Sequence, residues 1–155
     1  MRLREHVVQA AVTSAIASLF IGLAENAMLF LSIIFIDVDH YFDFALVCWR
    51  YGVRDMFKFH DWLWKNHRNA IYGLSVFHTV EVFAAVFLLG FITHYFWVVF
   101  AGFLMHMFFD LIFLYYHGVF HNRAFSIIEY WVRRRNPSSK RGYCVPDANF
   151  WGQGG

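Results

Sequence analysis

The sequence has little cysteine and little charge. Its 155 residues include only two cysteines, Cys48 and Cys144, and their wide separation argues against a disulfide scaffold or a thiolate zinc site. Charged residues form 15% of the chain, whereas soluble domains contain ~25%. The formal net charge is only +2, so no acidic partner is indicated and a basic module that binds nucleic acid is excluded.

Positive charge is missing from two long segments. There is no lysine or arginine between Arg4 and Arg50, nor between Arg68 and Arg123. These are the most hydrophobic parts of a chain that is 59% hydrophobic overall, a composition that excludes a disordered chain or a coiled coil. Each segment is long enough to cross a ~30 Å hydrocarbon layer twice, because one crossing needs ~20 residues.

We therefore predict an all-α membrane protein, a bundle of four transmembrane helices arranged as two antiparallel hairpins. The expected spans are 7–23, 27–44, 70–89 and 95–117. This topology places both termini and the middle segment on one side, which then carries every lysine and arginine of the sequence. The positive-inside rule makes that side cytoplasmic, so we expect a multi-pass protein of the inner (plasma) membrane.

Two alternatives to this topology are weaker. The first span resembles a secretory signal with a cleavage site near Ala24, but the apolar run resumes directly after it. Four buried helices of a soluble protein are the other alternative. A chain of 155 residues is too short to bury four helices that are hydrophobic on all sides.

The sequence divides into a large and two small parts. Residues 1–121 form the expected transmembrane domain, within which 45–69 is an interfacial, partly helical connector with tryptophan anchors. Residues 122–136 alternate apolar and basic side chains, which predicts an amphipathic helix at the anionic inner leaflet. Pro137 ends this helix. Residues 137–155 are rich in turn-forming types, so we expect an irregular tail.

Acidic and histidine side chains lie inside the expected spans, where each costs ~2.5–3.5 kcal/mol on insertion scales and usually marks function. Residues three or four apart share one face of a helix. The spacing therefore predicts three pairs on shared helix faces: Asp37 with His40, His78 with Glu81, and His106 with Asp110. Two further polar residues are His6, at the start of the first span, and Asp39, beside the first pair.

No lysine or arginine lies within the spans to compensate these acids, so the carboxylates must protonate or bind metal. Histidine with carboxylate is the ligand set of catalytic Zn²⁺, and equally of Mn²⁺ or Fe²⁺. All four spans offer such a group at a similar depth. We expect one or two divalent ions, with Zn²⁺ favoured. The expected ligands, in some subset, are His6, Asp37, Asp39, His40, His78, His106 and Asp110.

Two motifs resemble a known family. Segment 37–40 reads Asp-Val-Asp-His, and segment 102–110 has the form Gly-x-x-x-His-x-x-x-Asp. Together with the early His6 they resemble the membrane-bound metal-dependent hydrolase-like proteins. The resemblance covers about residues 1–121 and implies metal-dependent hydrolysis, with a phosphoester as the electrophile.

The middle of the chain departs from that family. Many members carry a His-Arg-Gly-x-x-His segment, whereas His67-Arg68 is followed here by Asn69, and the next histidine is His78. The third span is closer to a branch with His-x-x-Glu. The resemblance therefore covers the metal ligands better than the substrate-binding segment.

The main functional prediction is an integral-membrane metal-dependent hydrolase. The depth of the polar groups favours a lipid or lipid-linked phosphoester at the cytoplasmic headgroup level. The ion would lower the pKa of water toward ~7 and polarise the scissile bond, with Glu81 or Asp39 as the general base. His67 and Arg68 are candidates to hold a phosphate. Membrane lipids are the expected partners, with a second copy of the chain or a membrane complex also considered.

Two other functions stay open at this point. Histidines on facing spans, such as His78 and His106, ligate haem b in electron-transfer subunits of membrane complexes. The nearby acids argue against that function, because haem ligation does not use them. A third interpretation is a non-catalytic member of the family, in which the metal only stabilises the bundle.

Overall fold

The computed structural model of the chain describes residues 3–67, 73–135 and 145–152. Within these ranges the regular structure is helical, apart from one isolated bridge between Gly73 and Arg123. The expectation of an all-α fold is confirmed for this part of the chain.

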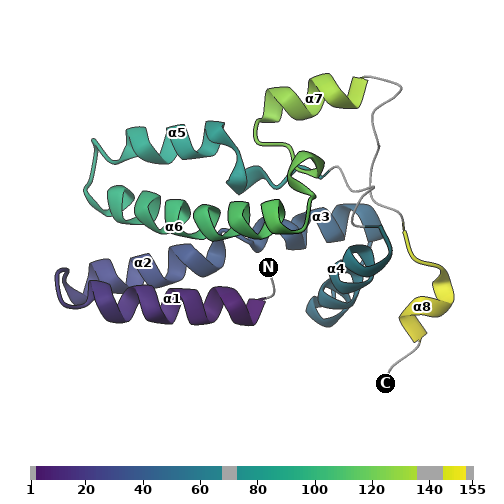
Figure 1. Cartoon of the computed structure of the whole chain (residues 1–155), viewed down its shortest axis with the longest axis horizontal. Helices are drawn as coiled ribbons and strands as arrows, with labels where there is room; N and C mark the ends of the chain where they lie inside the picture. Colours follow the sequence, from purple (N-terminus) through teal and green to yellow (C-terminus); the bar gives the residue numbers. More distant parts are fainter. Residues whose placement is uncertain (1–2, 68–72, 136–144, 153–155) are drawn as a thin grey trace.

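Two antiparallel helical hairpins form the body of the molecule (Figure 1). The first consists of α1 (Leu3–Ala17) and α2 (Leu23–Phe35), and the second of α5 (Val80–Leu89) and α6 (Tyr95–Tyr116). The hairpins pack against each other through α2 and α6. Their bends lie at the same end of the molecule (Figure 1).

The contact between α2 and α6 requires a glycine. A Cβ atom on Gly102 of α6 would collide with Oγ of Ser32 and would lie 3.2 Å from the carbonyl oxygen of Leu29. Leu29 and Ile33 of α2 are buried here together with Ala10 of α1. Close approach at Gly102 therefore sets the distance between the two hairpins.

The bend of the first hairpin is earlier than expected. The turn lies at residues 18–22, and Glu25 belongs to the first turn of α2, where a carboxylate is favoured by the helix dipole. Oε1 of Glu25 lies 3.3 Å from Nε2 of His94, which precedes α6. This contact joins the two bends.

The second expected span, 27–44, is not one continuous helix. It is broken at Ile36–Asp37, and the chain resumes as α3 (Val38–Cys48), with Asp37 at the N-cap position. Aspartate is unfavourable in a helix interior, although the side chain of Asp37 makes no hydrogen bond that caps α3. The Asp-x-Asp motif starts a new helix instead of lying inside one.

The third expected span is also shorter than predicted. Residues 68–72 lie outside the described part of the chain, and Val76–His78 forms a short 3-10 helix, η1, before α5 begins at Val80. The N–H of Val80 donates to the carbonyl oxygen of Phe125 at 2.9 Å. The expectation that His78 and Glu81 share one helix face is therefore wrong, because they belong to different elements.

The connector is helical, as expected, over α4 (Val53–His67). It buries Phe59 and Leu63 against Phe44 of α3, and Trp151 packs on the same cluster. Trp151 belongs to α8 (Ala148–Gly152), so the tail is not irregular throughout. Residues 136–144 and 153–155 lie outside the described part.

After α6 the chain turns back along the molecule. Gly118 adopts a positive φ of 66°, a conformation that glycine adopts without strain. The short 3-10 helix η2 (Phe120–Asn122) and α7 (Ile127–Arg135) follow. The amphipathic helix is thus shorter than the expected 122–136. Its residues Ile128, Trp131 and Val132 are exposed.

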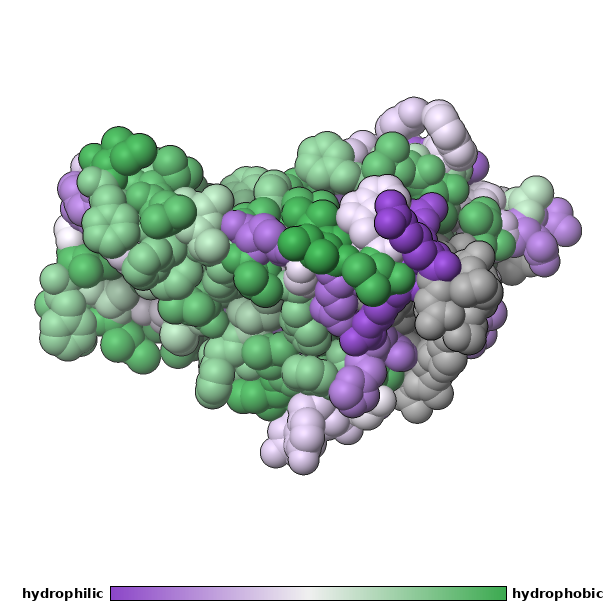
Figure 2. Space-filling view, turned by 90° about the horizontal axis from the view of Figure 1, so that it is seen from above, coloured by the Kyte–Doolittle hydropathy of each residue, from purple (hydrophilic) through white to green (hydrophobic). Residues whose placement is uncertain are grey.

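Helix α6 is the one described helix that is long and apolar enough to cross a membrane. Its 22 residues extend ~33 Å, which matches a hydrocarbon layer of ~30 Å. Only 17% of its most apolar window is buried. Hydrophobic side chains cover most of the end that holds the hairpins, whereas hydrophilic ones gather toward the other end (Figure 2).

Candidate metal centre

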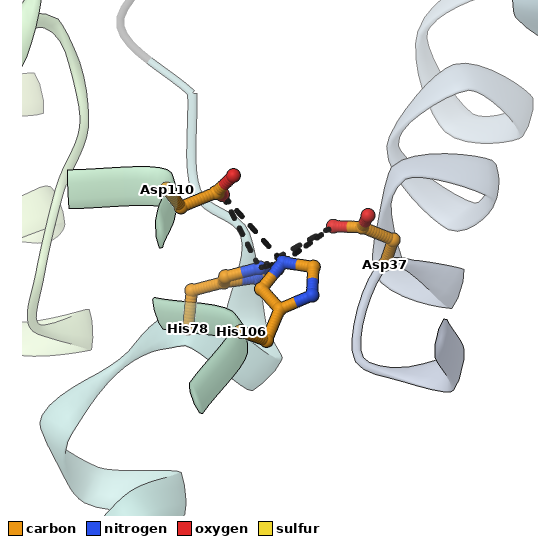
Figure 3. Close-up of side chains that lie close together, drawn as sticks. All are labelled: Asp37, His78, His106 and Asp110. Atoms are coloured by element: carbon orange, nitrogen blue, oxygen red, sulfur yellow. Dashed lines mark hydrogen bonds and ion pairs between the residues drawn. The ribbon is translucent and has the colours of Figure 1, made fainter. Parts of the chain in front are cut away.

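Four predicted ligands meet where the hairpins join the rest of the molecule (Figure 3). Asp37 comes from the break between α2 and α3, His78 from η1, and His106 and Asp110 from successive turns of α6. The two histidines and Asp110 are buried, and Asp37 is partly buried. The prediction that His106 and Asp110 share one helix face is confirmed.

The separations between the ligand atoms suit one tetrahedral ion. The Nε2 atoms of His78 and His106 lie 3.3 Å apart, and each lies 3.4 Å from Oδ1 of Asp37. Oδ2 of Asp110 lies 3.6 Å from Nε2 of His106 and 3.9 Å from Nε2 of His78. Metal–ligand bonds of ~2.0–2.2 Å in a tetrahedron separate the ligand atoms by ~3.3–3.6 Å. Five of the six separations are thus within a few tenths of an ångström of those that such an ion requires, and the sixth, between the two carboxylates, is at most 4.8 Å.

Hydrogen bonds on the far side of each ring fix which nitrogen faces the centre. Nδ1 of His106 donates to the carbonyl oxygen of Ile33 at 2.8 Å, and a carbonyl only accepts. Nδ1 of His78 lies 3.2 Å from Oδ2 of Asp39, which also accepts the N–H of Phe77 at 2.9 Å. In both neutral rings the lone pair of Nε2 then faces the centre, as in metal-binding histidines.

This arrangement calls for a cation. Two imidazole nitrogens and two carboxylates converge within 4.8 Å, and positive charge between them, from a metal ion or from a proton on an imidazole, removes their mutual repulsion. Among the described residues, Arg123 pairs with one of these carboxylates, with its Nη1 2.9 Å from Oδ2 of Asp110. The geometry and the donor types therefore fit a divalent metal ion.

Arg123 corrects one premise of the sequence argument. We expected no basic residue to compensate the acids, but the chain turns back after α6 and brings Arg123 to Asp110. The guanidinium is largely buried. Arg123 was missed because it lies outside the apolar segments, and its sequence position does not show that the chain returns.

His6 also lies in the centre, as predicted, beside His106. Its Nε2 lies 3.3 Å from Oδ2 of Asp37 and 3.7 Å from Oδ1 of Asp110. The side chain is only 2% exposed, and its ring stacks on that of His106. Gln9, one turn later on α1, donates to the carbonyl oxygen of Met105 at 2.9 Å, which fixes α1 against α6.

His40 lies at the edge of the centre. Its Nε2 is 3.5 Å from Oδ1 of Asp37, and its side chain is 35% exposed. Nε2 of His60, on α4, lies 3.2 Å from the carbonyl oxygen of His40. Burial lowers the pKa of His60 below its ordinary value, so its ring stays neutral. His60 was not among the predicted ligands, and its place beside the buried Phe59 is the sequence signal that could have indicated its position.

The other predicted site residues lie elsewhere. The carboxylate of Glu81 accepts hydrogen bonds from Oγ of Ser126 and from the N–H of Ile127, so it caps the start of α7. The ring of His67 packs on Trp62. Arg68 lies outside the described part of the chain.

Comparisons with known proteins add no relative. No family model matches the chain, no curated protein matches it, and no solved structure matches it. The functional argument therefore depends on the geometry of the centre.

Proposed function

We propose that the chain is a metal-dependent hydrolase of the membrane, whose divalent ion is held by Asp37, His78, His106 and Asp110. The observation that supports this most directly is the convergence, within 4.8 Å of one another, of four donor atoms from three separate segments. Zn²⁺ suits two imidazoles and two carboxylates at these separations, and Mn²⁺ or Fe²⁺ accept the same ligands.

The residues around the ion have distinct roles in this proposal. When bound, the ion polarises the scissile bond and lowers the pKa of water. Asp39 and the carbonyl of Ile33 hold the two imidazoles in the required tautomer. His40 is the titratable group at the accessible edge, 3.5 Å from Asp37, so we assign proton transfer to it. Glu81 receives no catalytic role, because its carboxylate accepts the hydrogen bonds that cap the start of α7.

A multi-pass membrane location is part of the proposal. Helix α6 has the length and outward-facing apolar surface of a span. Residues 23–48 would extend ~39 Å as one helix, and their break at Asp37 resembles the broken helices that line polar sites within membranes. The bends of the hairpins would then face outward and the termini would be cytoplasmic, where basic residues are favoured.

A lipid or lipid-linked phosphoester is the substrate that we propose. Asp110 lies six residues before Tyr116 at the end of α6, which is ~9 Å along the helix axis. The centre is therefore within reach of a headgroup at the cytoplasmic surface. The motif resemblance supports a phosphoester. The exposed apolar side chains of α7, beside Arg133–Arg135, are suited to an anionic lipid surface.

Metal analysis combined with a hydrolysis assay tests this function. Purified protein is expected to contain at least one metal ion per chain and to release phosphate or alcohol from lipid phosphoesters in a chelator-sensitive reaction. His106→Gln should lower turnover at least ~10²-fold, because the ion loses a ligand. Asp61→Asn, on the exposed surface of α4, is the control and should retain turnover. A metal-free wild-type protein would refute the proposal.

The distances disfavour haem ligation but do not separate an enzyme from a non-catalytic metal protein. Haem needs its axial nitrogens on opposite sides of the iron, ~4 Å apart across two metal–nitrogen bonds, but those of His78 and His106 are 3.3 Å apart. A non-catalytic metal protein has the same ligands as the enzyme. The assay separates these, because bound metal without turnover indicates a structural ion.

A further inference from the structure

Each carboxylate at the centre presents its two oxygens to different histidines. Oδ1 of Asp37 is the atom near His78 and His106, while Oδ2 of Asp37 is the atom near His6. Asp110 divides its oxygens in the same way. Its Oδ2 faces the first two rings, and its Oδ1 lies 3.7 Å from His6. Each carboxylate thus offers one oxygen to His6 and the other to His78 and His106.

The ring of His6 is placed as a ligand of its own. It lies nearly parallel to the ring of His106, with an interplanar angle of 13° and ring centroids 4.2 Å apart. Both rings direct Nε2 at the same two carboxylates. Ions bound to the two nitrogens would therefore lie side by side, and paired metal sites hold their ions ~3.5–4 Å apart.

The surroundings of His6 give no other role for its buried ring. The side chain is 2% exposed, and within the described residues its Nδ1 has no hydrogen-bond partner. Buried polar groups are normally bonded, so a histidine whose near contacts are two carboxylate oxygens is placed for ionic or metal binding. Three protein ligands with an open position are typical of catalytic metal sites.

We propose a second divalent cation site formed by Nε2 of His6, Oδ2 of Asp37 and Oδ1 of Asp110, with both carboxylates bridging two ions. This inference rests on the proposed function, because the first ion completes the pair. It goes further in making the centre dinuclear and in assigning the N-terminal helix to it.

Charge balance extends the inference to the substrate. The side chains of Asp37, Asp39, Asp110 and Arg123 sum to a formal charge of −2, which one divalent ion balances. A second ion leaves the centre positive, so its binding is strengthened by an anionic ligand. The paired site therefore favours a substrate with a charged phosphoester group over a neutral carboxylic ester. The first ion should bind more tightly than the second, which has three protein ligands.

Manganese titration followed by electron paramagnetic resonance tests the second site. Full-length protein in detergent is stripped with a chelator and titrated with MnCl₂. We expect two Mn²⁺ per chain and the spectrum of an exchange-coupled pair, because both carboxylates bridge the ions. His6→Gln should bind one Mn²⁺ with an uncoupled spectrum. His94→Gln, at the bends of the hairpins, should keep two coupled ions.

The outcomes separate this inference from the proposed function. One Mn²⁺ in both the wild type and His6→Gln overturns the second site and leaves the first in place. Two Mn²⁺ without coupling in the wild type overturn the bridging carboxylates, and this measurement does not depend on a variant that folds. Absence of any tight Mn²⁺ or Zn²⁺ from the wild type overturns the proposed function itself.

Discussion

Asp39 shows how a residue that does not face the ion controls the centre. Its Oδ2 accepts from Nδ1 of His78 and from the N–H of Phe77, so it sets both the tautomer and the orientation of that ring. Partners of this kind are worth ~10–100-fold in metal affinity. We had expected Asp39 to be a direct ligand or a base, and its position instead supports His78.

Asp39→Asn should therefore weaken metal binding by ~10–100-fold without unfolding the protein. The asparagine amide offers an N–H where a proton acceptor is needed, so the lone pair of Nε2 in His78 no longer has to face the centre. Competition with a chromophoric chelator measures the change. Asp61→Asn is the matched control. Equal affinities for the Asp39→Asn variant and the wild type would contradict the role in orientation.

At the same scale, the sequence predicted the ligands better than their neighbours. Asp37, His78, His106 and Asp110 could be identified because ionisable groups are costly in apolar segments. Arg123 and the carbonyl of Ile33 could not. A backbone carbonyl has no sequence signal, and Arg123 reaches Asp110 only because the chain reverses after Gly118.

At the scale of elements, α6 was predictable and the second and third spans were not. The uninterrupted apolar run 95–117 was predicted as one helix, and the structure has one helix, α6, over Tyr95–Tyr116. The run 27–44 was broken at Asp37, a residue type that is unfavourable inside a helix. The described residues before α5 contain only the short helix η1. The backbone on either side of η1 is bonded to residues that follow α6, through Gly73 and Val80. Such long-range contacts do not show in periodicity.

Gly102→Ala tests how the contact between α2 and α6 positions the centre. The new methyl group would collide with Ser32 and push α6 from α2, with an expected cost of ~1–3 kcal/mol for overpacking. His106 should then lose its hydrogen bond to Ile33, and metal affinity should fall. Thermal unfolding with and without added Zn²⁺ measures both effects.

A second substitution distinguishes this explanation from a general loss of helix stability. Ser32→Ala removes the oxygen with which the new methyl group collides, so the double variant should recover part of the loss. Gly152→Ala has nothing within 4 Å of the added Cβ and should leave the unfolding temperature unchanged. If Ser32→Ala gives no recovery, the collision is not the cause.

At the scale of the whole molecule, one question is whether the hairpins cross the bilayer. Helix α6 is long enough, whereas α1 and α5 have 15 and 10 residues and extend ~22 Å and ~15 Å. Ile92, in the bend of the second hairpin, is 77% exposed, and Ile128 on α7 is 70% exposed. The bend of the second hairpin and α7 lie well apart along the length of the molecule (Figure 1).

Labelling of single cysteines answers that question. In a background of Cys48→Ser and Cys144→Ser, Ile92→Cys should react with a membrane-impermeant maleimide added to intact cells. Ile128→Cys should react only after the membrane is opened. If Ile92→Cys is protected in both conditions while Ile128→Cys behaves as expected, the hairpins end within the bilayer and the proposed topology is wrong.

The ligands are spread along the chain in a way that orders biogenesis. His6 and Asp37 emerge from the ribosome early, whereas His106 and Asp110 emerge only with α6. In the proposed membrane enzyme, the nascent chain would contain His6, Asp37 and His78, three of the five proposed donors, before His106 and Asp110 are synthesised. Binding of the ion would then be a late step. A chain released before α6 is complete lacks His106 and Asp110.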